Sequence, residues 1–358
     1  MRVLDKYVLR RFLTTFLFAI VAFVLIVIFV DMVGNLGKFI DKSVPTSIIF
    51  KYYLFYIPQV VSLILPMSVL LAAMFSLGQL ARHDELTAIK SAGVSLNRIL
   101  LPLFTLSVVM SIAAFVFDDR AVPAASRKKS EIEMQYLDAH KKYSKTRIEN
   151  LFLRDSLDRR VFIGRFDTGS KIAHRVTIQK YQGNRIVERL DAQTMNWVNG
   201  TWVLSNGYRR KFENGREDAE RFASLRDESL TFTPEELLEK QADPEYMSSA
   251  ELNKFIRDVE RNGGDPRKWL VSLHFGYAQP FAIFILVLMG SPIAASKNRS
   301  GAVFGLIIST MIYLLYFGIS RLVQTLGEIG ILQPLHAAWL TNAIFLLAGL
   351  VLLALMRK

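Results

Sequence analysis

The strongest constraint on this chain is a set of six long runs without a single Asp, Glu, Lys or Arg residue. Each run is long enough to cross a hydrocarbon core of about 30 Å as a helix, which takes about 20 residues. We therefore predict an α-helical membrane protein with six transmembrane helices. The expected spans cover about residues 12–33, 53–80, 99–117, 270–294, 301–321 and 333–356.

Charge is concentrated in the middle of the chain. Of the 76 Asp, Glu, Lys and Arg residues, 55 lie between Asp118 and Lys268. This distribution predicts a soluble domain over 118–268, inserted between an N-terminal membrane half (1–117) and a C-terminal one (269–358). The formal net charge is +12, but the middle is nearly balanced, with 29 basic and 26 acidic residues. We therefore expect no nucleic acid partner.

Basic residues next to the uncharged runs indicate the orientation. By the positive-inside rule, the segments that carry them face the cytoplasm. We therefore expect both termini in the cytoplasm and the middle domain in the periplasm. The residues on which this orientation depends are Arg2, Lys6, Arg10, Arg11, Arg82, Lys90, Arg98, Lys297, Arg299, Arg357 and Lys358.

From about residue 146 the pattern changes to short, partly alternating runs typical of β-strands, separated by turn dipeptides. We expect an all-β, jellyroll-like domain over about 146–232, with the strands in an antiparallel sandwich or jellyroll. An amphipathic helix over about 249–262 should follow, opened by a Ser248–Glu251 capping box. The predicted turns are Gly183-Asn184, Asn199-Gly200, Asn206-Gly207 and Asn214-Gly215.

A second short helix is predicted between the second and third spans, over about 84–91. Asp84 is a candidate N-cap, Glu85 suits the positive end of the helix dipole, and Gly93 can end the helix. This helix would lie in a cytoplasmic loop.

Enzymatic motifs are scarce. There is no phosphate-binding P-loop, no cysteine, and no paired histidine pattern, so we expect no cofactor and no metal site in this chain. Asp118 and Asp119, at the end of the third span, are candidates for a general acid and base. Charged residues that end a span are the commoner case.

Some basic residues fall on the side where the positive-inside rule should deplete them. Cations at the outer leaflet suit an anionic lipid head group, because phosphates accept charge-assisted hydrogen bonds. The alternative explanation is that Lys and Arg side chains near the ends of membrane helices extend their charge to the interface without binding any ligand. The candidates for glycolipid binding are Lys38, Lys42, Lys51 and Arg321.

Three stretches resemble one known family, the LptF/LptG (YjgP/YjgQ) permeases of lipopolysaccharide export in Gram-negative bacteria. They begin at Leu4 (LDKYVLRRF), Pro66 (PMSVLLAAMFSLGQLARHDELTAIKSAG) and Met247 (MSSAELNKFI). The resemblance covers essentially the whole chain. The opening VLDKY and the closing LMRK look more like the G member than the F member.

The resemblance implies a permease subunit of an ABC exporter, without catalysis of its own, in the inner membrane. It would extract lipopolysaccharide from the outer leaflet and pass it along its periplasmic jellyroll. The implied partners are a second LptF/LptG-type permease, a cytoplasmic LptB-like ATPase dimer that binds the ATP, and LptC- or LptA-like jellyroll proteins. The helix at 84–91 would dock on the ATPase, through Arg82, Asp84, Glu85, Leu86, Ile89 and Gly93.

Three alternatives remain open from sequence. A mechanotransmitting ABC permease has spans, an outer domain and an ATPase partner, but moves no lipid itself. A periplasm-facing lipid-modifying enzyme would use Asp118 or Asp119. A structural scaffold would show no coupling to nucleotide.

Overall fold

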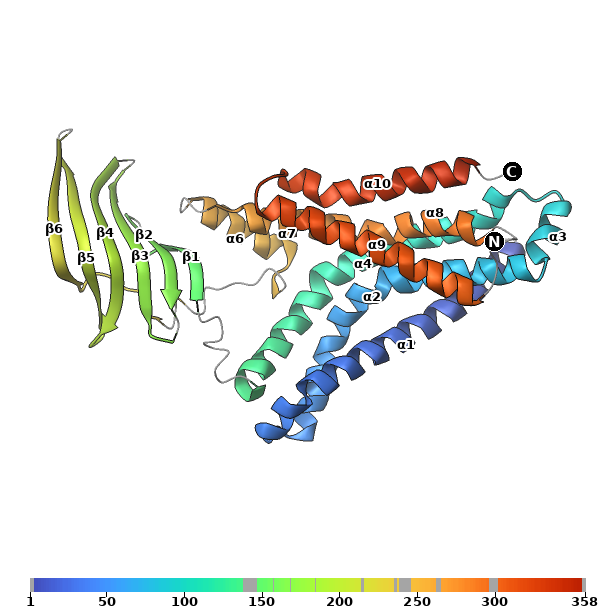
Figure 1. The fold of residues 1–358 in the computed structure, drawn as a ribbon, viewed down its shortest axis with the longest axis horizontal. Coiled ribbons are helices and arrows are strands. Elements are labelled where there is room, and N and C mark those ends of the chain that lie inside the picture. Colours follow the sequence, from blue (N-terminus) through green and yellow to red (C-terminus); the bar gives the residue numbers. More distant parts are fainter. Residues whose placement is uncertain are drawn as a thin grey trace. The chain divides into compact units, whose positions relative to one another are not determined.

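The chain folds into two units. A computed structural model describes residues 3–137, 147–156, 158–167, 169–183, 185–213, 216–234, 237, 246–261, 265–295 and 302–355. The helical unit comprises Met1–Ser130, Pro244–Leu252 and Arg267–Lys358, and the second unit comprises Glu131–Asp243 and Asn253–Pro266. Figure 1 shows long helices in the first unit and a sheet in the second.

The described residues of the helical unit contain six helices that are long and apolar enough to cross a membrane. The fourth span combines α7, η3 and α8, and the short α3 lies between α2 and α4. The helices are α1 (Val3–Asp41), α2 (Thr46–Arg82), α3 (Glu85–Ser91), α4 (Leu96–Ile132), α7 (Arg267–Ala278), η3 (Gln279–Phe281), α8 (Ala282–Ala294), α9 (Ala302–Glu328) and α10 (Pro334–Leu355).

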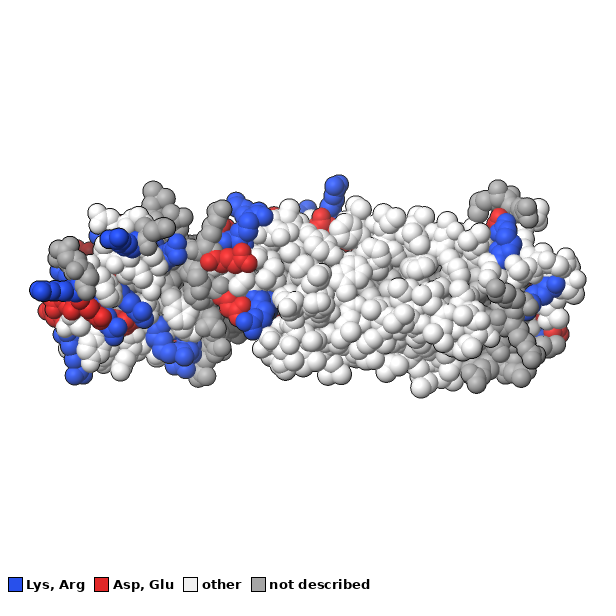
Figure 2. All heavy atoms as spheres, turned by 90° about the horizontal axis from the view of Figure 1, so that it is seen from above, with Lys and Arg blue, Asp and Glu red and all other residues white. Residues whose placement is uncertain are grey.

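Charged side chains avoid the middle of this unit. Figure 2 shows a broad uncharged band over the helices, with Lys, Arg, Asp and Glu at its two ends on the face in view. A hydrocarbon layer leaves no partner for an exposed charge, so a band of this kind is typical of a membrane-spanning surface. The predicted helical membrane protein with an inserted β domain is confirmed.

Helix α2 forms the centre of the helical unit. In its most apolar stretch, 72% of the residues are buried within the chain, compared with 6% in α1. Gly290 of α8 lies against Leu70 and Met74 of α2, where any side chain would collide with them. Helix α2 is continuous through Pro58 and Pro66, which both lie inside it. The missing hydrogen bonds are tolerated because neighbouring helices support the backbone.

Six antiparallel strands form one sheet in the second unit, and each strand pairs with the next in the chain. This simple meander differs from the predicted sandwich. The described strands make a single sheet, because each short turn joins two strands that pair with each other. The strands are β1 (Arg147–Arg154), β2 (Arg159–Asp167), β3 (Ile172–Gln182), β4 (Arg185–Val198), β5 (Thr201–Glu213) and β6 (Arg216–Asp227).

One face of the sheet carries the apolar core of the second unit. Trp202 is fully buried there, and its Nε1–H donates a 2.7 Å hydrogen bond to the carbonyl oxygen of Phe232. Alternate residues of β2 to β5 share this core, as the period of a strand requires. Strand β6 contributes little to the core, and most of its residues are exposed. It pairs only with β5 and is therefore an edge strand of the described sheet.

Two predicted turns had different outcomes. Asn199-Gly200 joins β4 to β5 with both residues at positive φ (50° and 80°), as a two-residue hairpin turn requires. Asn206-Gly207 was predicted as a turn but lies within β5. Gly207 is there because the Asp191 carbonyl oxygen and the Phe222 ring occupy the space that a Cβ would need. The Asn214-Gly215 turn lies outside the described residues.

The predicted amphipathic helix is α6 (Ser249–Arg261), in which Leu252, Ile256 and Val259 are buried. Its capping box is confirmed. Glu251 Oε2 accepts hydrogen bonds from the Ser248 N–H and Oγ at 2.9 and 2.8 Å. These bonds to Ser248, with a smaller effect of Arg127, hold the pKa of Glu251 below its usual value.

We expect Gly207→Ala to destabilise the sheet by about 1–3 kcal/mol, because the added methyl group has no room. Unfolding of the purified full chain, followed by tryptophan fluorescence, measures the loss. Gly169→Ala is the matched control, since a Cβ there meets nothing within 4 Å. Equal stability of the two variants would contradict the close approach at Gly207.

Candidate functional site

The short helix α3 lies at one end of the helical unit, between α2 and α4. It ends before Gly93, whose φ of 83° supports the predicted glycine stop. Its start differs from prediction. Asp84 has a left-handed backbone (φ 56°) and makes no side-chain capping hydrogen bond, because an N-cap needs an extended backbone to reach the following amides.

Glu85 ties α3 to the first turns of α1. Its Oε2 accepts a 2.6 Å hydrogen bond from Tyr7 Oη, and its Oε1 accepts one of 2.9 Å from Arg11 Nη2. Arg11 also lies over the Tyr7 ring, 4.7 Å from the ring centroid. The Glu85 and Arg11 side chains are both about 30% exposed, so water screens this ion pair only in part. The carboxylate is therefore engaged within the chain.

A second ion pair fixes the same end of α1. Arg98, near the start of α4, places Nη1 2.8 Å from Asp5 Oδ1 and donates from Nη2 to Oδ2 at 3.0 Å. Two parallel contacts of a guanidinium with a carboxylate are stronger than one and fix its orientation. The N-terminal turns of α1 thus hold both α3 and the start of α4.

Leu86, which the resemblance implies as a docking residue, is buried in this chain. Leu86 is only 4% exposed and belongs to the core of the helical unit, against which Ile89 also packs. Helical spacing places these two residues on one face, and that face is turned inward. The predicted Arg82 and Asp84 are exposed, and the exposed residues of α3 itself are Thr87, Ala88, Lys90 and Ser91.

The basic residues predicted at the other end of the unit do not form one cluster. Lys38 and Lys42, at the end of α1, are exposed, and Lys38 Nζ donates to Asn35 Oδ1 at 2.9 Å. Lys51 is exposed near the start of α2. Arg321 lies on α9 and lines a pocket, described below, together with residues of α2, α4 and α7.

Two further cations of α4 were not predicted. Lys129 Nζ lies 4.0 Å from the centroid of the Tyr56 ring, and Lys128 Nζ lies 5.2 Å from that of Phe55, both on α2. Cation–π contacts of this kind hold the charge at the edge of the apolar surface. The sequence signal was present in the adjacent lysines, but their aromatic partners are more than 70 residues away.

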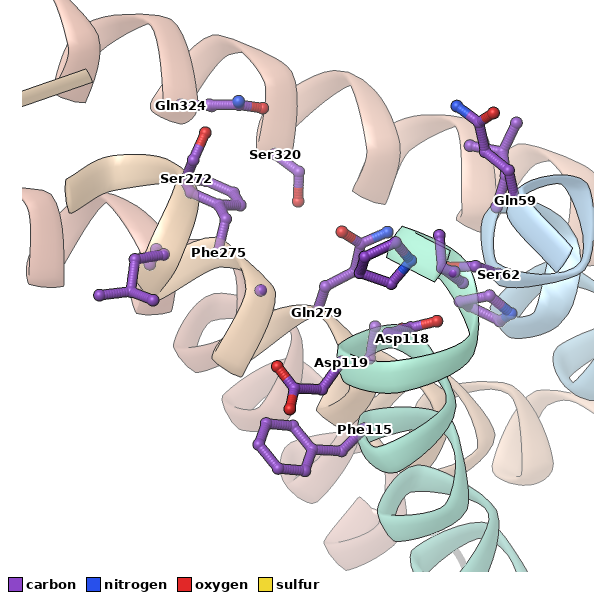
Figure 3. A pocket seen from close by; sticks show the side chains of 18 of the residues that line it. Gln59, Ser62, Phe115, Asp118, Asp119, Ser272, Phe275, Gln279, Ser320 and Gln324 are labelled. Carbon is purple, nitrogen blue, oxygen red and sulfur yellow. The ribbon is translucent and has the colours of Figure 1, made fainter. Parts of the chain in front are cut away.

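A pocket of about 460 Å³ opens among α2, α4, α7 and α9. Figure 3 shows Gln59 and Ser62 from α2, Asp118 from α4, Gln279 from η3 and Ser320 from α9 around it. The first turn of α6 also lines the pocket, through Ser249 and Leu252. Polar side chains are thus gathered inside an otherwise apolar helical unit.

Asp118 and Asp119 do not form the acid–base pair considered from sequence. They are neighbours on a helix and point to different sides of the pocket (Figure 3). The Ser62 hydroxyl hydrogen-bonds the Asp118 carboxylate, and Asp119 Oδ1 accepts a 2.7 Å bond from the Ser249 N–H. Asp119 therefore fixes the start of α6, although both carboxylates line the pocket.

Comparison with known proteins identifies the family. The model of the lipopolysaccharide export system permeases LptF/LptG matches residues 6–355, nearly the whole chain. The chain belongs to the LptF/LptG family. Its members are permeases of the lipopolysaccharide export system.

Curated relatives extend this match. The chain is 24% identical to the lipopolysaccharide export system permease protein LptF of Escherichia coli (strain K12), over 98% of this chain and 94% of LptF. It is 21% identical to LptG of the same strain, over 99% of this chain and 98% of LptG. The predicted closer likeness to the G member is not supported, because identity is slightly higher to LptF.

We expect Arg11→Gln to loosen α3, because the variant loses the charge-assisted bond to Glu85. A bond of this kind contributes about 1–2 kcal/mol, so the α3 amides should exchange hydrogen about 5- to 30-fold faster. Hydrogen exchange with mass spectrometry measures this. Arg10→Gln, one residue earlier on α1, is the control and should leave α3 unchanged. Unaltered exchange in Arg11→Gln would show that Glu85 does not hold α3.

Proposed function

We propose that this chain is one permease subunit of an ABC exporter that extracts lipopolysaccharide from the outer leaflet of the inner membrane. A second LptF/LptG-type permease would complete the transmembrane part, and an LptB-like ATPase dimer would supply the energy. Membership of the family supports this assignment. Both termini and α3 would lie in the cytoplasm, and the β domain in the periplasm.

The observation that carries the proposal is the position of α1. Only 6% of its most apolar stretch is buried within the chain, while its first turns are tied by ion pairs to α3 and α4. A helix that is apolar but poorly covered needs lipid or a second subunit against it. Helix α1 is thus suited to line a cavity between two permeases.

Helix α3 would receive the motion of the ATPase. Its buried Leu86 holds it on the helical core, and its exposed residues, with Arg82 and Asp84 beside them, would form the docking surface. When ATP closes the ATPase dimer, a shift of α3 would reach α1 through Tyr7 and Arg11. Differential affinity of the two states for lipid would then drive release.

Helix α1 would also transmit the shift of α3 to the lipid-binding end of the helical unit. At 1.5 Å per residue, Lys38 lies about 40 Å along the helix from Arg11, close to the thickness of a bilayer with its head groups. Lys38 and Lys42 would meet the phosphates of the glycolipid there. Motion at α3 would therefore alter the position of the same helix that binds the head group.

The sheet would receive the lipid next. Strand β6 is an exposed edge, and unpaired backbone groups on an edge can add a strand from another chain. LptC- or LptA-like jellyroll proteins would extend the sheet in this way.

A charge swap tests the link between α3 and α1. Glu85→Lys should repel Arg11 and lower lipid extraction per ATP hydrolysed about tenfold, a loss equivalent to about 1.4 kcal/mol. The double variant Arg11→Glu with Glu85→Lys restores an opposite pair and should recover most of the extraction. Measurement requires the reconstituted complex with lipopolysaccharide and ATP. Failure of the double variant to recover would assign Glu85 to the ATPase surface alone.

The glycolipid site is tested at the other end of α1. Replacing both Lys38 and Lys42 with Glu should reduce co-purified lipopolysaccharide about tenfold, because two attractive contacts with phosphate become repulsive. ATPase assembly should be unaffected. Lys254→Glu, an exposed change on α6, is the control. Normal lipid content in the double variant would exclude these lysines from the site.

A further inference from the structure

The fourth span is interrupted where α7 meets α8. Residues Gln279–Phe281 form the 3₁₀ turn η3, which contains Pro280, a residue with no N–H for a helical hydrogen bond. The Ala282 N–H is directed to the carbonyl oxygens of Gln279 and Pro280 and not to that of Ala278. The Ala278 carbonyl oxygen therefore lacks the donor that an α-helix would supply.

Asn342 of α10 supplies a donor in its place. Its Nδ2 donates to the Ala278 carbonyl oxygen at 2.7 Å, and its Oδ1 accepts a 2.8 Å bond from Tyr316 Oη of α9. The bond from Tyr316 fixes which end of the amide faces Ala278, because Oδ1 can accept the hydroxyl hydrogen and Nδ2 cannot. Asn342 and Tyr316 are only 3% and 7% exposed. Buried polar groups inside a span are costly unless they are bonded, and they often mark function.

Proline alone does not explain the interruption. Pro58 and Pro66 lie within α2, and Pro292 lies within α8, yet both helices continue through them. What distinguishes the turn at Pro280 is the side chain of Asn342, which satisfies the carbonyl oxygen that the 3₁₀ form leaves open.

We propose that Gln279–Phe281 is a rotational joint in the fourth span and that Asn342 is the latch that holds it in the 3₁₀ form. When the latch opens, the Ala278 carbonyl oxygen regains a donor if the Ala282 N–H turns to it and the segment becomes α-helical. A 3₁₀-helix has 3.0 residues per turn and an α-helix 3.6. Three residues that change form therefore rotate α7 relative to α8 by about 60° and shorten the span by about 1.5 Å.

Helix α7 is the half that would move. Ten of the 13 residues of α8 are buried, compared with three of the 12 residues of α7. Helix α8 packs closely on α2 at Gly290, and α9 is also tied to α2, because Tyr313 Oη donates to the Leu63 carbonyl oxygen at 2.9 Å. Helices α2, α8 and α9 thus provide a fixed surface against which α7 can turn.

Rotation of α7 would change the pocket among α2, α4, α7 and α9. Figure 3 shows Ser272 and Phe275 of α7, and Gln279 of the joint itself, around this space. Side chains extend about 5–6 Å from a helix axis, so a turn of about 60° moves them by a similar distance. The joint would therefore set the shape of the pocket. This inference does not depend on the proposed export activity.

Distances between two spin labels test the joint. The sequence has no cysteine, so Lys268→Cys on α7 and Ser47→Cys on α2, both at exposed positions, take one label each. Double electron–electron resonance on the full chain in nanodiscs should give one main distance. Adding Asn342→Leu should produce a second distance, shifted by up to about 5 Å. Thr341→Val is the matched control and should cause no shift, because Thr341 is 1% exposed and its Oγ1 has no hydrogen-bond partner among the described residues.

A second pair of labels covers a rotation that the first pair does not register. It replaces the label at Lys268 with one at Gly276→Cys, about 80° around α7, where a side chain meets nothing within 4 Å. At least one of the two pairs should shift in Asn342→Leu. Unchanged distances in both pairs would overturn the proposal.

A further variant keeps the test decisive if Asn342→Leu misfolds. Pro280→Ala restores an N–H at the joint, so it should favour the α form and give the same second distance with Asn342 intact. Pro292→Ala, inside the continuous α8, is its control and should leave the distance unchanged. The parent distance in Pro280→Ala would overturn the joint. An equal shift in Thr341→Val or Pro292→Ala would show a general loosening of the helices and refute the latch.

Discussion

The contact on which the account depends is the Glu85 carboxylate between Tyr7 and Arg11. It joins two helices that the sequence separates by more than 70 residues, and it does so where α3 has only seven residues of its own. A helix this short is not stable alone. Leu86 in the core and Glu85 on α1 together fix its position, so α3 and α1 behave as one mechanical element.

The second constraint is the cost of polar groups inside an apolar unit. At the α3 end, Arg98 forms an ion pair with Asp5 and donates a hydrogen bond to its Oδ2. At the pocket, Asp118 and Ser126 are left without a full set of partners. The Asp5 carboxylate thus has an opposite charge beside it, while the Asp118 carboxylate has the Ser62 hydroxyl.

The sequence predicted those features that depend on local residue spacing or on the exclusion of charge from the membrane. The uncharged runs predicted six spans, the Ser248–Glu251 spacing predicted a capping box, and Asn199-Gly200 predicted a hairpin turn. Contacts at long range were not predictable. The docking role of Leu86 came from the family resemblance, and helical spacing shows that Leu86 shares a face with Ile89 but not which way that face turns. Asn206-Gly207 was misread because glycine serves both tight turns and close packing.

The link between α3 and α1 is tested most directly by replacing it with a covalent one. The chain contains no cysteine, so Tyr7→Cys with Glu85→Cys introduces the only thiols of this subunit. The measurement is lipopolysaccharide extracted per ATP by the reconstituted complex, before and after a flexible bis-maleimide joins the two thiols. We predict weak extraction before crosslinking and recovery afterwards, because the covalent tie again moves α1 with α3. Continued ATP hydrolysis without recovery of extraction would contradict the account.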